Sequence, residues 1–404
     1  MDIISLASSF PRHRDDPSGR FIADLNVGLV KRGHRLLQLA PEAEGAARRE
    51  GLFPGYLVER FPFAVADWQR GIVYGDGIGA NLKRNPALVS ALSALHFGFQ
   101  RALSEALIRH PQAAILSHWA IPAGWVAARA NLRERRSHVS VLHGGGVQLL
   151  KVLPFGSRFL RTWAQGTDRC LCVSADLAEK TRAQLGPKTL PIRVQPMGID
   201  LDRFRPRGRR EETRRELGLG PETFFVLGVG RLVKLKGFDL LIRAAQDLGD
   251  VSVALAGEGP ERVDLLSDAE ASSLDLHLLG RLGPEKLRDI YEAADVLVVP
   301  SRLGPKGRSE GSPVVVPEAY AAGLPVIASR TGGLSEAVQD QRTGHLFPAE
   351  DVSSLREILL VLKDDLEMRQ SMAKAAFQEA RHWGYDAVAA AVEEELIAAI
   401  EQRS

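Results

Sequence analysis

The segment from residue 296 to residue 333 limits most strongly how this chain can fold. An apolar run, Val296–Val299, leads into a polar loop rich in glycine, and an alanine-rich stretch then leads to a second apolar run within AAGLPVIAS. This order predicts a strand, a loop, a helix and another strand. Repeated units of this kind build parallel sheets, so we expect an α/β protein.

Two glutamates lie eight residues apart in this segment. Glu310 falls in the loop, and Glu318 opens the alanine-rich stretch. In an open α/β sheet, small molecules bind outside the carboxyl ends of the strands, so we expect both glutamates at a ligand-binding edge. Ser312 and Pro313 are typical of a helix N-cap and first helical position. Pro317 indicates an irregular start or a helix that begins at that residue.

The length and composition predict two domains in a reducing compartment. A chain of 404 residues with 45% hydrophobic residues can bury two α/β cores. Its only two cysteines, Cys170 and Cys172, fall on one expected strand, where we expect core packing on opposite sides of the sheet. We expect neither a disulfide nor a metal site from them. No apolar stretch reaches membrane-spanning length, which favours a cytoplasmic protein.

The charge is divided unevenly along the chain. Residues 1–195 carry 26 Lys and Arg against 15 Asp and Glu, a net +11, and the remainder carries 26 against 35, a net −9. A basic half favours an anionic lipid surface or a phosphorylated acceptor. A solvated surface without a partner is the alternative interpretation. We read the tract 203–215 as solvated surface, and we expect no nucleic-acid partner.

Several candidate site residues follow expected strands. His118 ends the run AAILS, and His143 follows HVSVL, so both histidines should lie at strand carboxyl ends. Arg231 and Lys236 follow the strand TFFVLGV and precede a helix. Two cations beside main-chain NH groups suit a diphosphate without a metal. A dinucleotide-binding GxGxxG is incomplete because Val233 stands where the third glycine is needed, and no Walker A motif is present.

The motifs GRLVKLKG, the paired glutamates, AAGLPVIAS and TGG together resemble the retaining glycosyltransferases of family 4, which have the GT-B fold. The resemblance implies two facing Rossmann-like domains with a deep interdomain cleft and a C-terminal helix that crosses back to the N-terminal domain. It implies an acceptor domain at 1–195, a linker at 196–206, a donor domain at 207–380 and a returning helix at 381–404. Asp200 and Asp202 fall in the linker, so the resemblance implies no catalytic metal.

The resemblance also assigns roles to individual residues. Glu310 would face the donor sugar, Glu318 would hold the ribose, and Arg231 and Lys236 would bind the donor diphosphate. The implied catalytic residues are Glu310, His118, Arg231 and Lys236. The implied donor-binding residues are Gly19, His143, Gly230, Arg231, Lys236, Gly259, Arg281, Leu282, Gly311, Ser312, Pro313, Glu318, Gly332 and Gly333.

The implied reaction is transfer of a hexosyl or similar group from a nucleotide diphosphate sugar, with retention at the anomeric carbon. No cofactor is expected beside the donor, and a UDP-sugar is favoured over a GDP-sugar. The acceptor would be a glycan, a lipid-linked molecule or a small molecule in cell-surface polysaccharide or glycoconjugate synthesis, and the basic half favours a peripheral position at the inner membrane surface. Two alternatives stay open: a nucleotide-sugar epimerase of the same architecture, and a nonenzymatic sugar-nucleotide-binding subunit.

Overall fold

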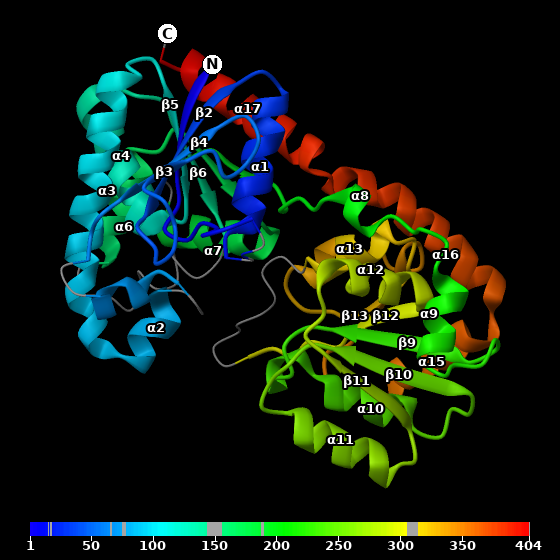
Figure 1. Ribbon diagram of the computed structural model, residues 1–404. Coiled ribbons are helices and arrows are strands. Elements are labelled where there is room, and N and C mark those ends of the chain that lie inside the picture. Colours follow the sequence, from blue (N-terminus) through cyan, green and yellow to red (C-terminus); the bar gives the residue numbers. More distant parts are fainter. Residues whose placement is uncertain are drawn as a thin grey trace. The chain divides into compact units, whose positions relative to one another are not determined.

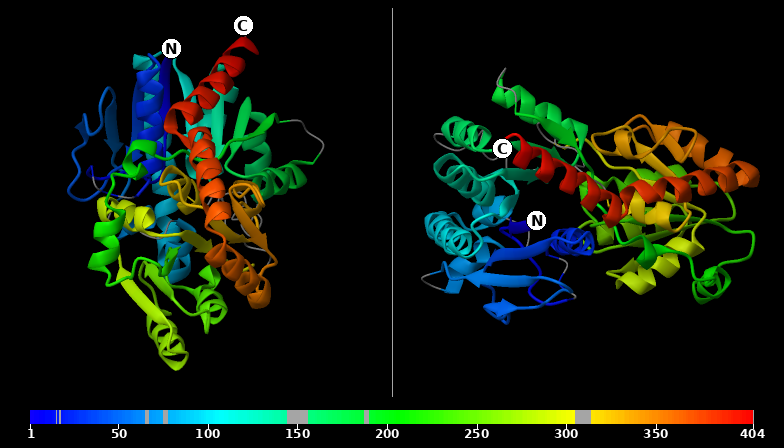
Figure 2. Two further views of the ribbon diagram at one scale, coloured as in Figure 1. Left: turned by 90° about the vertical axis from the view of Figure 1, so that its right-hand side faces the viewer. Right: turned by 90° about the horizontal axis from the view of Figure 1, so that it is seen from above.

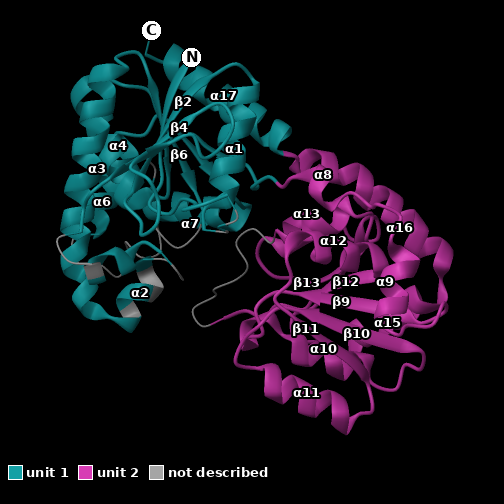
Figure 3. Ribbon diagram, in the orientation of Figure 1, with its two compact units in different colours: residues 1–198, 385–404 teal, residues 199–384 magenta. Residues whose placement is uncertain are grey.

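The computed structural model describes residues 1–14, 16, 18–64, 67–74, 78–143, 156–186, 190–304 and 314–403. The chain divides into two compact units (Figure 3). Unit 1 comprises Met1–Gly198 together with Tyr385–Ser404, and unit 2 comprises Ile199–Gly384. The C-terminal residues therefore belong to the same unit as the N-terminus.

An eight-stranded sheet forms the centre of unit 1 (Figure 1), and its strands are parallel except for the edge strand β3. In sheet order the strands are β3 (Arg49–Glu50), β4 (Leu57–Phe61), β2 (Arg35–Pro41), β1 (Asp2–Leu6), β5 (Ala114–His118), β6 (His138–Leu142), β7 (Arg169–Cys172) and β8 (Ile192–Val194).

Helices cover both faces of this sheet because successive residues of its strands point to opposite faces. Ile3 of β1 packs among residues of α1 and α17, whereas Ile4 packs among residues of α3 and α4. The helices of unit 1 are α1 (Arg20–Lys31), α2 (Ile78–Arg84), α3 (Val89–Arg109), α4 (Trp125–Glu134), α6 (Gly156–Gln165), α7 (Ala175–Leu185) and α17 (Tyr385–Glu401), with short turns η1 (Asp67–Ile72), η2 (Pro86–Leu88) and η3 (Ala120–Gly124).

The C-terminal helix α17 lies beside α1 (Figure 2). Gly28 of α1 permits the close approach, since a Cβ atom added there would lie 2.9 Å from Cβ of Ala389. Two polar contacts tie this segment to the rest of unit 1: Glu393, in the middle of the helix, bonds to Nε2 of His34 at 2.8 Å, and Arg403, just beyond its end, bonds to Asp168. The helix is thus an integral part of unit 1.

Unit 2 is built on a six-stranded sheet in which every neighbouring pair is parallel. In sheet order the strands are β11 (Asp275–Gly280), β10 (Val251–Ala256), β9 (Phe224–Val229), β12 (Val296–Val299), β13 (Val326–Ser329) and β14 (Gly344–Phe347). Leu227 in the central strand lies opposite Ala254 of β10 and Leu297 of β12, which sets the register on both sides. The expectation of Rossmann-like α/β units is confirmed.

Helices cover both faces of the second sheet as well. Val226 packs among residues of α10, α11 and α15, whereas its neighbour Leu227 packs among residues of α12, α13 and α16. The helices of unit 2 are α8 (Leu201–Phe204), α9 (Arg210–Glu216), α10 (Phe238–Ala245), α11 (Arg262–Ala271), α12 (Pro284–Ala293), α13 (Val315–Ala321), α14 (Leu334–Ala337), α15 (Val352–Asp364) and α16 (Leu366–Glu379), with short turns η4 (Lys234–Lys236) and η6 (Ala380–Trp383).

Helix α13 begins at Val315, two residues before Pro317. Proline is tolerated at this position because the NH groups of the first helical turn have no partner within the helix. The helix therefore contains Pro317 in its first turn and does not begin there.

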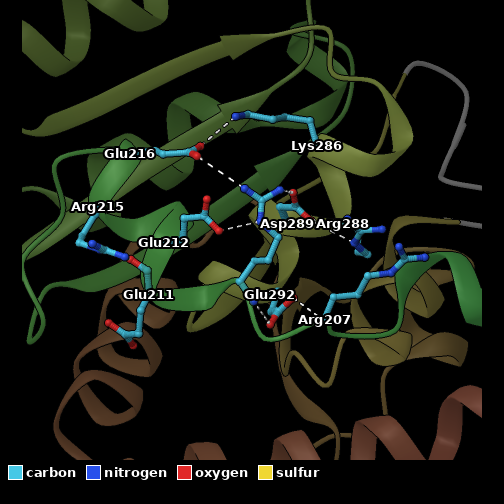
Figure 4. A network of polar contacts seen from close by, with 10 residues as sticks. Arg207, Glu211, Glu212, Arg215, Glu216, Lys286, Arg288, Asp289 and Glu292 are labelled. Atoms are coloured by element: carbon cyan, nitrogen blue, oxygen red, sulfur yellow. Dashed lines mark hydrogen bonds and ion pairs between the residues drawn. The ribbon is translucent and has the colours of Figure 1, made fainter.

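The arginine-rich tract 203–215 is not simply solvated surface, and that interpretation was wrong. Arg209 donates a hydrogen bond to Asp289 of α12 at 2.9 Å, within a network of charges that joins α9 to α12 (Figure 4). Arg214 is buried, donates to Asp295 at 3.3 Å and also donates to main-chain carbonyl groups. The tract binds α9 to α12 and to the residue that precedes β12.

The two cysteines face the same side of β7, and the expectation of opposite sides was wrong. Residues two positions apart on a strand share a face. The Sγ atoms of Cys170 and Cys172 are 4.0 Å apart, and both buried side chains are free thiols.

Candidate functional site

The sheet of unit 2 has a topological switch point between β9 and β12. Counted from its first strand, the sheet runs in the order 3-2-1-4-5-6, so the chain moves outward in opposite directions from these two neighbours. Ligands of open α/β sheets bind outside the carboxyl ends of the strands at such a point. The loops that follow β9 and β12 therefore form the expected ligand-binding edge of unit 2.

The loop after β9 brings two of the predicted cations to this edge. Lys236 lies over Gly230: a Cβ atom added to this glycine would be 3.2 Å from Cε and 3.7 Å from Nζ of the lysine. Arg231 follows directly and is exposed. Gly237 starts α10 with a φ of 66°, and its added Cβ would meet the carbonyl oxygen of Pro300 at 2.1 Å, so only glycine fits between the two loops.

The loop after β10 packs against the loop after β9. The NH group of Leu232 donates to the carbonyl of Glu258 at 2.9 Å. A Cβ atom on Gly259 would lie 2.2 Å from the carbonyl oxygen of Leu232, so a side chain at residue 259 would push the two loops apart. Gly259 thus has a steric reason to be glycine, whatever ligand lies nearby.

The loops after β11 and β13 reach the same sheet edge. The NH group of Gly257 donates to the carbonyl of Gly280 at 2.8 Å, so the first residue after β10 lies beside the last residue of β11. Arg281, which follows, is exposed, and Leu282 packs against the core. After β13, Gly332 has a φ of 43° and Gly333 precedes α14.

The glutamate in the first turn of α13, Glu318, lies in a partly buried, hydrogen-bonded setting. Oε2 of Glu318 accepts a hydrogen bond of 3.0 Å from the hydroxyl of Tyr291, a fully buried residue of α12. Burial raises the pKa of Glu318 to about 7, while the Tyr291 hydrogen bond and the charge of Arg203 act in the opposite direction. This carboxyl group therefore changes its charge near neutral pH.

Four predicted site residues lie outside the described residues: Glu310, Gly311, Ser312 and Pro313. The described residue Arg302 precedes them, and its guanidinium donates to both carboxylate oxygens of Asp239 in α10, at 2.5 and 2.6 Å. Its NH group also donates to the carbonyl of Leu235 at 2.8 Å. Arg302 thus ties the start of the loop after β12 to the loop that carries Lys236, a role that our sequence analysis did not assign.

The sheet of unit 1 has an equivalent switch point between β1 and β5. Gly19 lies in the loop after β1 with a φ of 68°, and its added Cβ would be 2.4 Å from the carbonyl oxygen of Ser9. Buried Asp16 holds this loop by accepting hydrogen bonds from the NH groups of Arg12 and Ser18, both at 3.0 Å. Gly19 is therefore required by the backbone of the loop.

The structure brings the two predicted histidines into direct contact. Nδ1 of His118, at the end of β5, lies 2.9 Å from Nε2 of His143, which follows β6. Burial lowers the pKa of His118 to about 3. The pKa of His143 is lowered well below its ordinary value, mainly by burial and to a smaller extent by the electrostatic effect of His118. Both rings are therefore neutral at physiological pH. The glycines that follow, Gly144–Gly146, lie outside the described residues.

Aromatic rings that the sequence analysis did not single out surround this pair. The ring of Phe21 lies 4.8 Å from that of His143, and the ring of Trp119 lies 5.1 Å from it. Trp119 has a φ of 67° and a ψ of 146°, which is rare for a residue with a side chain. The only sequence signal that pointed to Trp119 was its position next to His118.

No three His, Cys, Asp or Glu side chains among the described residues lie close enough together to hold a metal ion. No helix in the described part of the chain is both long and apolar enough to cross a bilayer.

Comparison with known families and structures agrees with this architecture. The family model described as Glycosyltransferase Family 4 matches residues 18–203, and the model described as Glycosyl transferases group 1 matches residues 209–379. The structure of sucrose-phosphate synthase (tll1590) from Thermosynechococcus elongatus superposes with a TM-score of 0.76 at 20% identity, covering 100% of both chains. The fold is that of the GT-B glycosyltransferases.

Within that class, the chain belongs to the family 4 glycosyltransferases. A D-inositol 3-phosphate glycosyltransferase from Corynebacterium jeikeium is 38% identical over 221 residues, covering 50% of this chain and 51% of that protein. The chain spans about half the length of the curated relatives that it matches. The structure of Anabaena HepE in complex with UDP and glucose superposes with a TM-score of 0.67 at 19% identity, covering 98% of this chain and 100% of HepE.

Proposed function

We propose that this protein is a retaining glycosyltransferase that uses a nucleotide diphosphate sugar, with the donor bound by unit 2 and the acceptor by unit 1. One observation carries the proposal. The switch point of the second sheet is flanked on one side by Arg231 and Lys236, in the loop after β9. On the other side lies Glu318, in the helix after β12. Cations there suit a diphosphate, and a carboxylate suits the two hydroxyls of a ribose.

The donor is proposed to bind without a metal. Arg231, Lys236 and nearby NH groups would offset the diphosphate charge in the ground state and the further charge that develops on it as the sugar leaves. The loops at Gly259, Arg281 and Leu282 would hold the base, and Gly332 and Gly333 would bring NH groups to the phosphates. UDP is the favoured nucleotide, because HepE, a structural neighbour, was solved in complex with UDP.

We propose that Glu310 and His118 act on the transferred sugar, as the resemblance to the family implies. Retention would follow a front-face route in which the departing phosphate helps to deprotonate the acceptor hydroxyl. His118 is neutral at physiological pH, so its contribution would be a hydrogen bond and not a positive charge.

The proposed acceptor is a small hydroxylated molecule whose ring carries the reacting hydroxyl. Support comes from the relative named D-inositol 3-phosphate glycosyltransferase. A lipid-linked glycan at an anionic membrane is the rival, which the net +11 charge of residues 1–195 favours. Binding of the protein to anionic vesicles, tested over a range of salt concentrations, separates the two.

A transfer assay tests the function. UDP-glucose is incubated with D-inositol 3-phosphate, and both UDP release and the anomeric configuration of any product are followed. Lys236→Met should abolish transfer, whereas Lys234→Met, at an exposed lysine two residues earlier, should retain it. Conversion of the sugar without an acceptor would identify an epimerase instead. Nucleotide binding with no turnover of any donor and acceptor pair would indicate a binding subunit.

A further inference from the structure

A pocket of about 30 Å³ lies between α3 and α4, which pack side by side over one face of the first sheet (Figure 1). Its lining residues come from the body of both helices, so the pocket is separate from the loops at the carboxyl edge of the sheet. Buried Leu103 and Val126 supply its apolar part. The lining residues Ser104 and Arg133 are exposed, so a group larger than the enclosed volume can enter from the solvent side.

Side chains that can donate hydrogen bonds line this pocket from both helices. On α3 they recur at every fourth position, at His96, Gln100 and Ser104, and on α4 Arg129 and Arg133 have the same spacing. Residues four apart lie on one face of a helix, so each set follows the pocket along its own helix. Two permanent cations and three further donors therefore converge on one small space.

These five side chains make no hydrogen bond or ion pair with one another or with any other described residue. A neighbouring arginine on α3 behaves differently, since Arg101 donates to Glu105 at 2.8 Å. The one carboxylate among the described lining residues belongs to Glu134, and its Oε2 lies 3.5 Å from Nε of Arg136, outside the set. The positive charge in the pocket is therefore not neutralised by the protein around it.

The ring of Trp125, the first residue of α4, holds two of these donors in place. Its centroid lies 4.9 Å from the guanidinium carbon of Arg129 and 4.8 Å from the centroid of the His96 ring. Burial, and to a smaller extent the charge of Arg129, lowers the pKa of His96, so the imidazole is neutral at physiological pH. A cation over an aromatic face is attracted to it, which restricts the arginine before any ligand binds.

We propose that the pocket between α3 and α4 binds a phosphate group, with Arg129 and Arg133 supplying the charge and Gln100 and Ser104 further hydrogen bonds. The planar guanidinium group matches the geometry of phosphate oxygens, and an anion there offsets the unpaired charge of the two arginines. The same chemistry recognises a soluble phosphate ester and the headgroup of an anionic lipid. This site does not depend on the proposed function, because it shares no residue with the donor site of unit 2.

Titration of inorganic phosphate into the full chain labelled with fluorotryptophan, at constant ionic strength, tests the inference. The Trp125 resonance, identified by its loss in Trp125→Phe, should shift and saturate, and the Trp68 resonance should not shift. Arg133→Gln should weaken phosphate binding by about tenfold or more, since it removes a charged donor. Glu134→Gln should strengthen binding, because it removes the one negative charge at the pocket.

The matched control is Arg101→Gln, which removes the same charge from an exposed position on α3 where the arginine is already paired. It should bind phosphate as the wild type does, and so should Lys236→Met, which separates this pocket from the donor site. All of these variants should melt close to the wild type. A Trp125 resonance that does not respond to phosphate, or equal loss of binding in Arg133→Gln and Arg101→Gln, overturns the inference.

Sedimentation with vesicles identifies the source of the phosphate group. Vesicles of phosphatidylglycerol and phosphatidylcholine are compared with vesicles of phosphatidylcholine alone. Binding to the anionic vesicles that Arg133→Gln loses and Arg101→Gln keeps assigns the pocket to a lipid headgroup. Binding of inorganic phosphate that depends on Arg133, together with vesicle binding that does not, assigns it to a soluble phosphate ester.

Discussion

The hydroxyl of Tyr291 donates a hydrogen bond of 3.0 Å to Oε2 of Glu318, which joins α12 to the start of α13 beside the switch point of the second sheet. The tyrosine is fully buried, and the pKa of the glutamate is raised to about 7 by burial. A hydroxyl donor favours the ionised carboxylate, so Tyr291 opposes the effect of burial. The pair keeps a partly buried acidic group able to ionise at physiological pH.

Removing this hydroxyl should weaken nucleotide binding. In Tyr291→Phe the Glu318 carboxylate loses a donor, its pKa rises further, and less of it is ionised at neutral pH. We expect about fivefold weaker binding of UDP at pH 7, equivalent to about 1 kcal/mol, by calorimetry. Unchanged affinity would show that Glu318 does not contact the nucleotide.

Donor binding should depend on pH through Glu318. Ribose hydroxyls donate to a carboxylate, so affinity should be present above the pKa of about 7 and fall as the pH drops below it. UDP-glucose is the suitable ligand because its diphosphate has no terminal group that titrates in this range. In Glu318→Gln the pH step should disappear, and a step that persists would assign the titration to another group.

The same glutamate should lower the stability of the free protein above neutral pH. Its folded pKa of about 7 exceeds its ordinary value of 4.5, so the folded state binds the proton more tightly and ionisation costs stability as pH rises from about 4.5 through 7. At pH 8, Glu318→Gln should increase the free energy of unfolding by about 1–3 kcal/mol and raise the melting temperature accordingly. At pH 4 it should change both quantities little. An equal change at both pH values would contradict the raised pKa.

The contact between the loops after β9 and β12 should depend on Gly237. In Gly237→Ala, a side chain is placed at a φ of 66° and its Cβ collides with the carbonyl of Pro300. The substitution should therefore lower the free energy of unfolding by about 3 kcal/mol or more and weaken UDP binding. Gly249→Ala is the control: its φ is 57°, but nothing lies within 4 Å of an added Cβ, so about 1 kcal/mol is expected. If Gly237→Ala and Gly249→Ala lowered the melting temperature equally, the contact between the two loops would contribute nothing to stability.

The fold was largely predictable because local patterns determine it. Apolar runs such as Val296–Val299 form strands in the core, and Gly237 lies where a strand-to-helix connection requires glycine. The contacts of Tyr291 and Arg302 were not predictable, since each joins residues distant in the sequence. The charge pattern of the tract 203–215 likewise does not reveal that α12 supplies its partners.

In the candidate site, the positions of His118 and His143 followed from strand ends, but their mutual hydrogen bond did not. Sequence order places two loops at one edge of a sheet without setting the distance between their side chains. The strained backbone of Trp119 is equally invisible in sequence, because tryptophan after a strand normally signals core packing.

Thermal stabilisation by UDP, GDP, ADP and dTDP, each with EDTA and with magnesium, tests the central claim most directly. A nucleotide that binds only the folded protein should add roughly 2.7 kcal/mol at about 100 times its Kd. We expect one nucleotide, UDP in the first instance, to stabilise the wild type and Lys234→Met in EDTA, and to leave Glu318→Ala and Lys236→Met unchanged. Stabilisation by none of the four, or equal stabilisation of all four proteins, would contradict a donor site on unit 2.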